Sequence, residues 1–346
     1  MREIWDVAQK WHTENKRITL GTVIKVTGSS LRPEGSMMII ADDGAIYGSV
    51  TGGCVEGAVF DEAKEVLKSG KPKLLSYGVS NEQAWEVGLS CGGSVEIFVE
   101  SMESAAWKGI SALVEQSIAE NQLAALLTVV SGEGAANKLH LTFDGVMHGT
   151  LGSPSLDQAA HALVAEMWTM RKAALLELPG GITVFADFIL PPPRLLIIGA
   201  SHIAIPLVAL ANTLDYHTVV IDPRSAFATR ERFPHVDELV LQWPDEALEN
   251  LKLDTSTCVV CLSHDDKLDN PALLYAMRSP ARYIGALGSK VTNANRLVAL
   301  RQEGATEEEL KRIHAPIGLK IGSRAPAEIA LSIMAEIVAT AHNVVA

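Results

Sequence analysis

The sequence predicts an α/β protein built in two ways: a C-terminal doubly wound parallel sheet, and an N-terminal α/β (α+β) domain that contains an internal repeat. The first expectation rests on short apolar runs that alternate with segments of helical period after residue 194, the pattern of a parallel sheet with both faces covered. The second rests on motifs that recur in the same order before residue 190. A run of prolines separates the two patterns.

The N-terminal repeat is visible as matching segments at a constant spacing. Residues 43–50 (DGAIYGSV) match residues 144–151 (DGVMHGTL) at an offset of 101 residues. Residues 71–75 match residues 172–176 at the same offset. Chance similarity between generic strand-turn-helix segments is the alternative explanation. The two copies span about residues 18–100 and 123–188.

Each copy is expected to place strands on both sides of one helix. Thr22–Ile24 correspond to Thr128–Val130 at an offset of 106, and Ile97–Phe98 correspond to Val184–Phe185 at an offset of 87. The second copy is therefore five residues shorter before the matched hairpin and fourteen residues shorter after the helix. The helices are expected at residues 56–68 and 157–171.

The two copies of the repeat can be compared with each other, because both have to pack the same arrangement of strands against a helix. Features of both copies are expected to be architectural, and features of the first copy alone are expected to be functional. Three features belong to the first copy alone: the loop at residues 27–35, the turn Gly52–Gly53–Cys54 and the stretch at residues 78–91. The second copy has Ser153–Pro154–Ser155 in place of the glycine turn.

Three consecutive prolines at residues 191–193 divide the chain. Proline lacks the backbone N–H and restricts the residue before it, so this run fits neither a helix nor a central strand. We expect an N-terminal domain over residues 1–190, a stiff linker over residues 191–193 and a C-terminal domain over residues 194–346.

Apolar runs in the C-terminal domain predict five parallel strands. They lie at residues 195–198, 218–221, 239–241, 258–262 and 283–287. Helices are expected at residues 203–213 and 271–277. A last helix is expected to begin near Pro326, which suits a first helical turn, and to end near His342.

A glycine-rich turn follows the first of these strands. Gly199, Ser201 and Ala204 occupy the three positions of the G-x-G-x-x-G/A fingerprint, which brings a pyrophosphate to a helix N-terminus in Rossmann-like domains. Asp222 ends the second strand, where a ribose-binding carboxylate belongs, and Arg224 would suit a 2′-phosphate. NAD and NADP are thus not distinguished. The alternative is a doubly wound domain that binds no dinucleotide.

Polar side chains also follow the first and fourth strands. His202 comes after the first strand, and His264 and Asp265 come after the fourth. With the usual strand order these two strands are neighbours, and ligands bind beyond their carboxyl ends. The three side chains are therefore candidates to converge on one ligand. The alternative is that they are solvated or cap a helix.

The four cysteines fall into two groups. Cys258 and Cys261 lie three residues apart on a predicted strand, so they point to opposite faces and are expected to be buried rather than to share a metal. Cys54 and Cys91 each adjoin paired glycines, whose backbone N–H groups can form an anion-binding nest. The Cys54 turn also opens a helix, whose positive end favours a thiolate. Inert small residues in tight turns are the alternative. The glycines are Gly52, Gly53, Gly92 and Gly93.

Composition excludes several kinds of partner. The chain has 29 Lys and Arg against 41 Asp and Glu, a net charge of −12, which is the wrong sign for a nucleic acid backbone. No apolar run approaches the roughly 18 residues of a membrane span, and the acidic N-terminus does not resemble a signal peptide. We therefore expect a cytoplasmic protein with no membrane span and with free thiols.

Ten short motifs follow one another along the chain: GSS at 28–30, GSV at 48–50, GGCVE at 52–56, AWEVGL at 84–89, CGG at 91–93, GASH at 199–202, DPR at 222–224, YIGALGS at 283–289, PIGLKIG at 316–322 and PAEIA at 326–330. Taken together, these motifs resemble the XdhC/CoxI family of xanthine dehydrogenase accessory proteins. The resemblance runs from about residue 5 to residue 340 and is loosest over residues 101–190. Family members usually have glycine where this chain has Ser201.

This resemblance implies an accessory role. Similar proteins hold the molybdenum cofactor, a phosphorylated pyranopterin dithiolene, while its molybdenum gains a terminal sulfur, and then help to deliver it to a molybdenum hydroxylase such as xanthine dehydrogenase. It implies a cysteine desulfurase as sulfur donor and a homo-oligomer. Carried over to this chain, it assigns Cys54 and Cys91 to the molybdenum of the cofactor, with Gly52, Gly53, Gly92 and Gly93 shaping the site.

Two other functions remain open from the residues alone. One is an NAD(P)-dependent oxidoreductase that uses the Asp222 site, with His202 or His264 as the proton donor. The other is an adaptor that docks hydroxylase and sulfur donor without binding a ligand.

Overall fold

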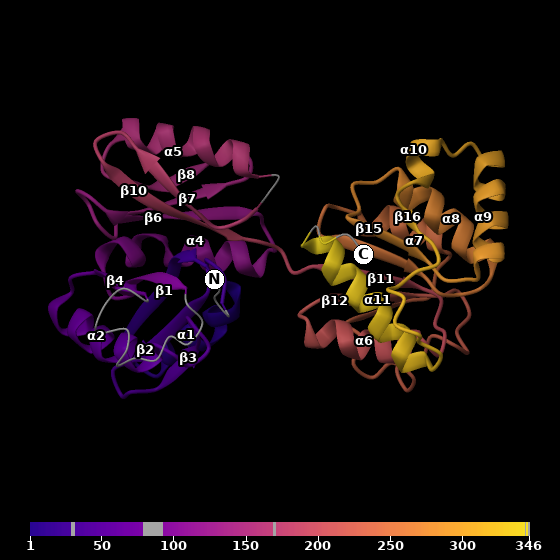
Figure 1. Cartoon of the computed structure of the whole chain (residues 1–346), viewed down its shortest axis with the longest axis horizontal. Coiled ribbons are helices and arrows are strands. Elements are labelled where there is room, and N and C mark those ends of the chain that lie inside the picture. Colours follow the sequence, from indigo (N-terminus) through magenta and orange to yellow (C-terminus); the bar gives the residue numbers. More distant parts are fainter. Residues whose placement is uncertain (29–31, 79–92, 169–170, 343, 345–346) are drawn as a thin grey trace. The chain divides into compact units, whose positions relative to one another are not determined.

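The computed structural model describes residues 1–28, 32–78, 93–168, 171–342 and 344, and divides into two compact units, Met1–Pro191 and Pro192–Ala346 (Figure 1). Within these described ranges, no helix is long and apolar enough to cross a membrane.

The first unit contains two antiparallel five-stranded sheets of the same topology. In the first sheet the strands are ordered β3-β2-β1-β5-β4, and in the second β8-β7-β6-β10-β9. The first sheet consists of β1 (Ile18–Thr27), β2 (Met37–Ala41), β3 (Ile46–Gly48), β4 (Lys73–Tyr77) and β5 (Ser94–Ser101). The second consists of β6 (Ala124–Ser131), β7 (Lys138–Thr142), β8 (Met147–Gly149), β9 (Ala174–Leu178) and β10 (Ile182–Ile189).

The strand register confirms the internal repeat. Ile18 pairs with Ala41 in the first sheet, and Ala124 pairs with Thr142 in the second, which reproduces the offsets of 106 and 101. Both copies also have a β-bulge at the same place, with Ile24 in β1 and Val130 in β6 passed over by the pairing. A bulge is a specific local feature, so its recurrence is hard to explain by chance.

Within residues 1–28, 32–78, 93–168 and 171–191, each sheet of the first unit is covered on its outer face by one helix. The helices are α2 (Glu56–Ser69) and α5 (Pro154–Met167). Helix α2 buries Val59, Ala63 and Val66, which recur at helical spacing and face one side. It ends at Gly70, whose left-handed backbone closes the helix.

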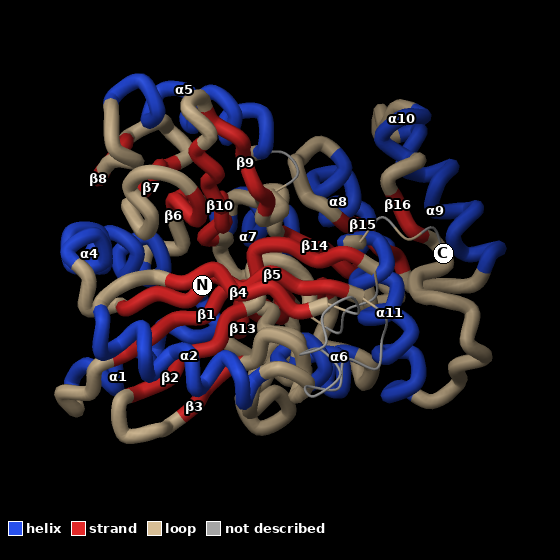
Figure 2. The backbone as a smooth tube through the Cα atoms, turned by 60° about the vertical axis from the view of Figure 1, so that its left-hand side comes forward, coloured by secondary structure: helices blue, strands red, loops and turns tan. Residues whose placement is uncertain are grey.

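The inner faces of the two sheets meet helices α1 (Arg2–Thr13) and α4 (Ala105–Ala119) in one shared core. Helix α1 lies beside β2 and β3 (Figure 2). Where the sheets meet directly, Ile24 and Phe98 pack against Val130 and Phe185, which are their counterparts in the second copy. The first unit thus consists of two sheets of the same topology that pack around a shared core.

The second unit is the doubly wound domain that the sequence predicts. Its sheet is parallel throughout, in the order β13-β12-β11-β14-β15-β16. The strands are β11 (Arg194–Ile198), β12 (His217–Ile221), β13 (Glu238–Val240), β14 (Thr257–Cys261), β15 (Tyr283–Ala286) and β16 (Ile313–His314). The helices are α6 (Ala204–Thr213), α7 (Pro244–Leu251), α8 (Asp266–Met277), α9 (Lys290–Gln302), α10 (Glu307–Leu310) and α11 (Pro326–Ala341).

Separate cores cover the two faces of this sheet. Helices α6 and α11 pack on one face, and helices α7, α8 and α9 pack on the other. Cys258 belongs to the first core and Cys261 to the second, and both are fully buried. The expectation of two buried cysteines on opposite faces is therefore confirmed. Burial also raises the pKa of both thiols.

Helix α8 begins earlier than the sequence predicts, at Asp266 rather than near residue 271. The side chain of Asp265 caps it by accepting a hydrogen bond from the N–H of Lys267. Capping by a carboxylate satisfies a backbone donor that the first turn leaves free. This capping fixes the start of the helix before Pro271, which then lies inside it.

Candidate functional site

The three features of the first copy alone leave from one end of its sheet, called here the loop end. Thr27 pairs with Ser94, and Tyr77 pairs with Val95, so β1 and β4 finish where β5 begins. Strand β3 also ends there, because Gly48 pairs with Met38 near the start of β2. The register thus brings the loop after β1, the turn after β3 and the connection from β4 to β5 to the same end.

The turn after β3, residues 49–55, is called the open turn here, because these residues precede α2 without being part of the helix. Gly52 and Gly53 have φ angles of 84° and 120°, a region that side chains disfavour. Cys54 follows them and lies two residues before the first helical residue, Glu56. The glycines therefore permit the turn that presents Cys54.

The carboxylate of Glu56 holds this open turn together. It accepts hydrogen bonds from the backbone N–H groups of Thr51, Gly52 and Gly53 at 2.9, 3.0 and 2.9 Å. It also accepts from the Ser49 hydroxyl at 2.6 Å and from the Thr51 hydroxyl at 2.8 Å. Partial burial alone would raise the pKa of Glu56, but these hydrogen bonds outweigh it and lower the pKa to about 2.

The nest of glycine N–H groups is therefore filled by the chain's own carboxylate. The sequence suggested that the N–H groups of Gly52 and Gly53 would receive an anionic ligand. In the structure both groups donate to Glu56, so these two glycines shape the turn and do not offer free donors. The role of Glu56 was not predicted from the sequence, although its counterpart at an offset of 101, Asp157, is also acidic and offered a signal.

The side chain of Cys54 is half-buried at the loop end. It packs against the core beneath α2, and Val26 and Tyr77 pack against the same core. Val26 and Tyr77 both pair with Val95, so they lie in one row across β1, β5 and β4. The Cys54 side chain is therefore partly accessible to solvent and is held in place by its packing against this core.

The second copy has a closed version of the same turn. There α5 begins at Pro154, which corresponds to Gly53, whereas α2 begins three residues later in the repeat. Ser153 caps α5 by accepting a hydrogen bond from Leu156. Ser155, the counterpart of Cys54, is thus part of the first helical turn.

Cys91 and Gly92 lie outside the described residues. Gly93, which follows them, is buried and directly precedes β5 at Ser94. On the other side of this connection, Gly78 follows β4, and a Cβ atom there would lie 2.9 Å from the Cβ of Ser94. The connection that contains Cys91 therefore starts and finishes at the loop end, which is the end that carries Cys54.

The glycine turn of the second unit is required by packing. Gly199 has φ of 96°, and a Cβ atom there would lie 2.6 to 2.7 Å from the backbone and Cβ of Ser263. Leu262 donates a hydrogen bond to the carbonyl of Ile198 at 2.8 Å. The ends of β11 and β14 thus touch, which brings their following residues to one edge of the sheet, called the crevice here because open α/β sheets bind ligands at this position.

Asp222 is fully buried and fully engaged within the chain. One carboxylate oxygen accepts from the N–H of Ala200 at 2.8 Å and from Arg224 at 2.7 Å. The other accepts from the N–H and Nε of Arg224 at 2.9 and 2.8 Å. Burial would raise the pKa of Asp222, but these hydrogen bonds outweigh it and lower the pKa. Both oxygens are thus already engaged where a ribose would need an acceptor.

The crevice residues show mixed roles. His202 and His264 are exposed and follow the neighbouring strands β11 and β14, and the convergence of His202, His264 and Asp265 on one ligand stays a prediction. Asp265 caps α8. The hydroxyl oxygen of Ser201 is buried and has no hydrogen-bond partner among the described residues. Arg224, 40% exposed, lies over the ring of Phe227 at 4.7 Å.

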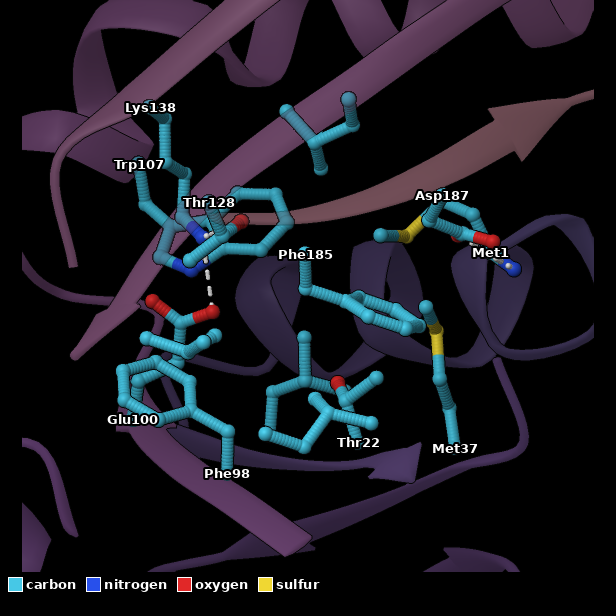
Figure 3. A pocket seen from close by; sticks show the side chains of 14 residues that line it. Met1, Thr22, Met37, Phe98, Glu100, Trp107, Thr128, Lys138, Phe185 and Asp187 are labelled. Carbon is cyan, nitrogen blue, oxygen red and sulfur yellow. Dashed lines mark hydrogen bonds and ion pairs between the residues drawn. The ribbon is translucent and has the colours of Figure 1, made fainter. Parts of the chain in front are cut away.

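A buried ion pair between the two sheets of the first unit was not predicted. Lys138 donates to Glu100 at 2.7 Å and to Thr128 at 2.9 Å, and its ammonium lies 4.4 Å from the centre of the Trp107 ring (Figure 3). These side chains line a cavity whose polar wall also includes Asp187. The cavity has room for about one water molecule, which is far too little for an organic cofactor.

No group of three or more His, Cys, Asp or Glu side chains that could hold a metal ion occurs among the residues with described positions. As far as these described residues are concerned, a metal-bearing cofactor would have to supply most of the ligands of its metal itself. Cys54 is the described cysteine whose sulfur is not buried in a core.

Two protein-family models match this chain, one in each unit. The family model described as the XdhC Rossmann domain matches residues 195–337, and the model described as the XdhC and CoxI family matches residues 11–78. The second match covers the open turn and Cys54, and the first covers the crevice.

Relatives match over nearly the full length. The chain is 26% identical over 336 residues to a probable xanthine dehydrogenase subunit of Bacillus subtilis, covering 96% of this chain and 95% of that protein. It is 27% identical over 324 residues to the molybdenum cofactor insertion chaperone PaoD of Escherichia coli, covering 93% of this chain and 83% of that protein. A crystal structure of a xanthine dehydrogenase from Bacillus halodurans superimposes with a TM-score of 0.78 at 25% identity, covering 98% of this chain and 96% of that one.

Proposed function

Because the chain belongs to the XdhC and CoxI family, we propose that it is an accessory protein that binds the molybdenum cofactor and delivers it to a molybdenum hydroxylase of the xanthine dehydrogenase type. The observation that carries this proposal is the open turn of the first copy, which presents Cys54 where the second copy has a closed helix start. The names of the two relatives support the same role.

The loop end fits a cargo that brings its own metal. Thiolate is a soft ligand that suits a metal already bound by the sulfurs of a dithiolene. Cys54 supplies one such sulfur, and Cys91 belongs to a connection that leaves from the same end of the sheet. We assign both cysteines to the molybdenum of the cargo, with Gly52, Gly53, Gly92 and Gly93 allowing the turns that present them.

The crevice of the second unit is proposed to hold a phosphate-bearing group. Arg224 supplies a fixed guanidinium after β12, and the exposed His202 and His264 follow β11 and β14, at the same carboxyl edge of the sheet. A planar guanidinium whose orientation is set by a carboxylate is a good partner for phosphate. Gly199 and Ser201 form the turn next to this group, and Asp222 acts by orienting Arg224.

The oxidoreductase alternative loses its main support in this arrangement. It required the Asp222 carboxylate as an acceptor for a ribose hydroxyl, and both oxygens already accept from Ala200 and Arg224. A ligand would have to break charge-assisted hydrogen bonds to reach them. We therefore assign no hydride transfer to this protein.

We further propose a sequence of partners. The protein keeps the cofactor bound while a cysteine desulfurase supplies the terminal sulfur of the molybdenum, and it then passes the cofactor to the hydroxylase. A homo-oligomer is part of the same proposal. An accessory protein of this kind binds its cargo and its partners without catalysing a metabolic reaction.

The cysteines provide the test of this function. Protein purified from cells that make the cofactor is expected to contain molybdenum, and Cys54→Ala combined with Cys91→Ala is expected to retain about tenfold less, because both soft ligands of the metal are lost. Tenfold corresponds to about 1.4 kcal/mol of binding free energy. Molybdenum per chain is measured by inductively coupled plasma mass spectrometry, and the released pterin by fluorescence.

Ser155→Ala is the matched control, because Ser155 is the counterpart of Cys54 in the second copy. It should leave the molybdenum content unchanged. If the double cysteine variant retains as much molybdenum as the wild type, the assignment of the thiols is wrong. If the wild type retains none, the cofactor role itself is wrong.

A further inference from the structure

We infer that Glu56 is a positioning residue that sets the open turn and thereby the exposure of the Cys54 sulfur. The inference rests on the proposed function only in taking Cys54 as the group that contacts the cargo. Glu56 does not touch that cargo in this scheme, because both of its carboxylate oxygens are engaged by the turn.

The hydrogen bonds show why one side chain controls the whole turn. The first oxygen of Glu56 accepts from the hydroxyl of Ser49 and from the N–H groups of Val50, Thr51 and Gly52. The second accepts from the hydroxyl of Thr51 and from the N–H of Gly53. Charge-assisted hydrogen bonds to a carboxylate are about twice as strong as neutral ones. Every residue from 49 to 53 is therefore tied to one charge.

The second copy shows what happens with a shorter side chain. Asp157 occupies the position of Glu56 and accepts from the hydroxyl of Thr150 and from the N–H of Leu151, at 3.0 and 2.7 Å. These two contacts correspond to those that Glu56 makes with Ser49 and Val50. Glu56 also accepts hydrogen bonds from the N–H groups of the three residues that follow Val50. The two contacts of Asp157 end at Leu151, the counterpart of Val50. One extra methylene thus carries the carboxylate further around the turn.

The start of the helix follows from this difference. In the second copy the residues after Leu151 enter α5 at Pro154, with Ser153 as the cap. In the first copy the corresponding N–H groups donate to Glu56, and α2 begins only at Glu56 itself. Cys54 consequently lies in the turn, whereas its counterpart Ser155 lies in the helix. A carboxylate near the first turn also interacts favourably with the helix dipole.

The test measures the reactivity of Cys54 without any cofactor. Full-length protein is treated with iodoacetamide, and alkylation of the Cys54 peptide is followed by mass spectrometry in wild type, Glu56→Asp, Glu56→Gln and Asp157→Asn. We expect alkylation about fivefold faster in both Glu56 variants, because without the full set of Glu56 hydrogen bonds the turn approaches the helix start of the second copy, where the counterpart Ser155 is exposed while Cys54 here is half-buried. Asp157→Asn should stay within about twofold of wild type, because it acts on the other copy.

The two Glu56 variants separate position from charge. Glu56→Asp keeps the charge and shortens the reach, so faster alkylation in this variant supports positioning. Faster alkylation in Glu56→Gln alone would show a charge effect and would overturn the inference, as would unchanged rates in both. Because no cofactor is present, these results do not depend on whether the protein carries molybdenum, which the cysteine variants decide separately.

A measurement on the wild-type protein covers the case in which a Glu56 variant fails to fold. Amide hydrogen exchange should show Gly52 and Gly53 protected, although both residues are exposed and precede the helix, because their N–H groups donate to a carboxylate. Exchange of both amides at the rate of an unstructured peptide would mean that Glu56 does not hold the turn.

Discussion

Replacing Lys138 with methionine is expected to lower the free energy of unfolding of the first unit by about 3–5 kcal/mol, because it leaves a buried carboxylate without its partner. Lys138 and Glu100 have side chains that are 1% and 4% exposed, and they meet at 2.7 Å. Burial raises the pKa of Glu100 and lowers that of Lys138, and their mutual attraction opposes both shifts. Each charge is thus tolerated only because the other is present.

The repeat explains why methionine is the informative substitution. Met37 corresponds to Lys138 at the offset of 101, and it lines the same cavity from the first sheet. A methionine side chain therefore fits this layer, and the expected loss reflects the unpaired Glu100 rather than a steric clash. The second variant, Lys138→Met with Glu100→Leu, should recover most of the loss, since replacing both members of a buried pair with apolar groups is often close to neutral.

Tryptophan fluorescence during denaturant unfolding provides the measurement. Five of the six tryptophans belong to residues 1–191, so the signal reports chiefly on the first unit. A loss below about 1 kcal/mol for Lys138→Met would be typical of a solvated ion pair and would contradict the buried pair. Equal losses in the single and double variants would point to packing instead.

Gly199→Ala is expected to destabilise the second unit by about 3 kcal/mol or more, because a left-handed backbone and a steric clash act together. The new Cβ atom would lie 2.6 Å from the Cα and 2.7 Å from the N of Ser263. Those backbone atoms lie two residues after the end of β14 at Cys261 and cannot rotate away. The fingerprint glycine is thus required by strand packing, whatever ligand the crevice receives.

Gly304→Ala in the same unit isolates the cost of the backbone conformation. Gly304 has φ of 88°, and a Cβ atom there would meet nothing within 4 Å. This control is expected to cost about 1–2 kcal/mol. Thermal unfolding followed by circular dichroism compares the two variants. If Gly199→Ala proves no more harmful than Gly304→Ala, the close approach of β11 and β14 is not real.

The sequence predicted the second unit well because its signals are local. Apolar runs such as residues 195–198 and 258–262 are buried on both faces of a parallel sheet, and they need no partner to be recognised. The internal repeat was predictable for a similar reason, since the same spacing has to serve the same register. Opposite faces for Cys258 and Cys261 followed from strand alternation alone.

The roles of charged side chains were less predictable, because they depend on what the fold places nearby. Asp222 sits where a ribose-binding carboxylate belongs, yet Arg224 two residues later folds back onto it. The glycine nest at Cys54 was visible, but its occupant, Glu56, was not recognised. Lys138 and Glu100 are 38 residues apart and belong to different copies, so neither signals the other.

In the proposed function, the two copies divide structural and functional work within the first unit. The sheets, the bulges and the outer helices recur in both. The second copy closes its helix start with Ser153 and Pro154, whereas the first holds it open with Glu56 and presents a thiol. Under that proposal, the first copy carries the turn that contacts the ligand and the second copy has only the scaffold.

Molybdenum K-edge X-ray absorption of cofactor-loaded protein tests most directly whether the open turn holds the cargo through Cys54. Wild type and Cys54→Ser are compared, with Cys91 kept in both. The proposed function predicts one more sulfur neighbour of molybdenum in the wild type than in the variant. Identical sulfur coordination in the two loaded proteins would contradict it.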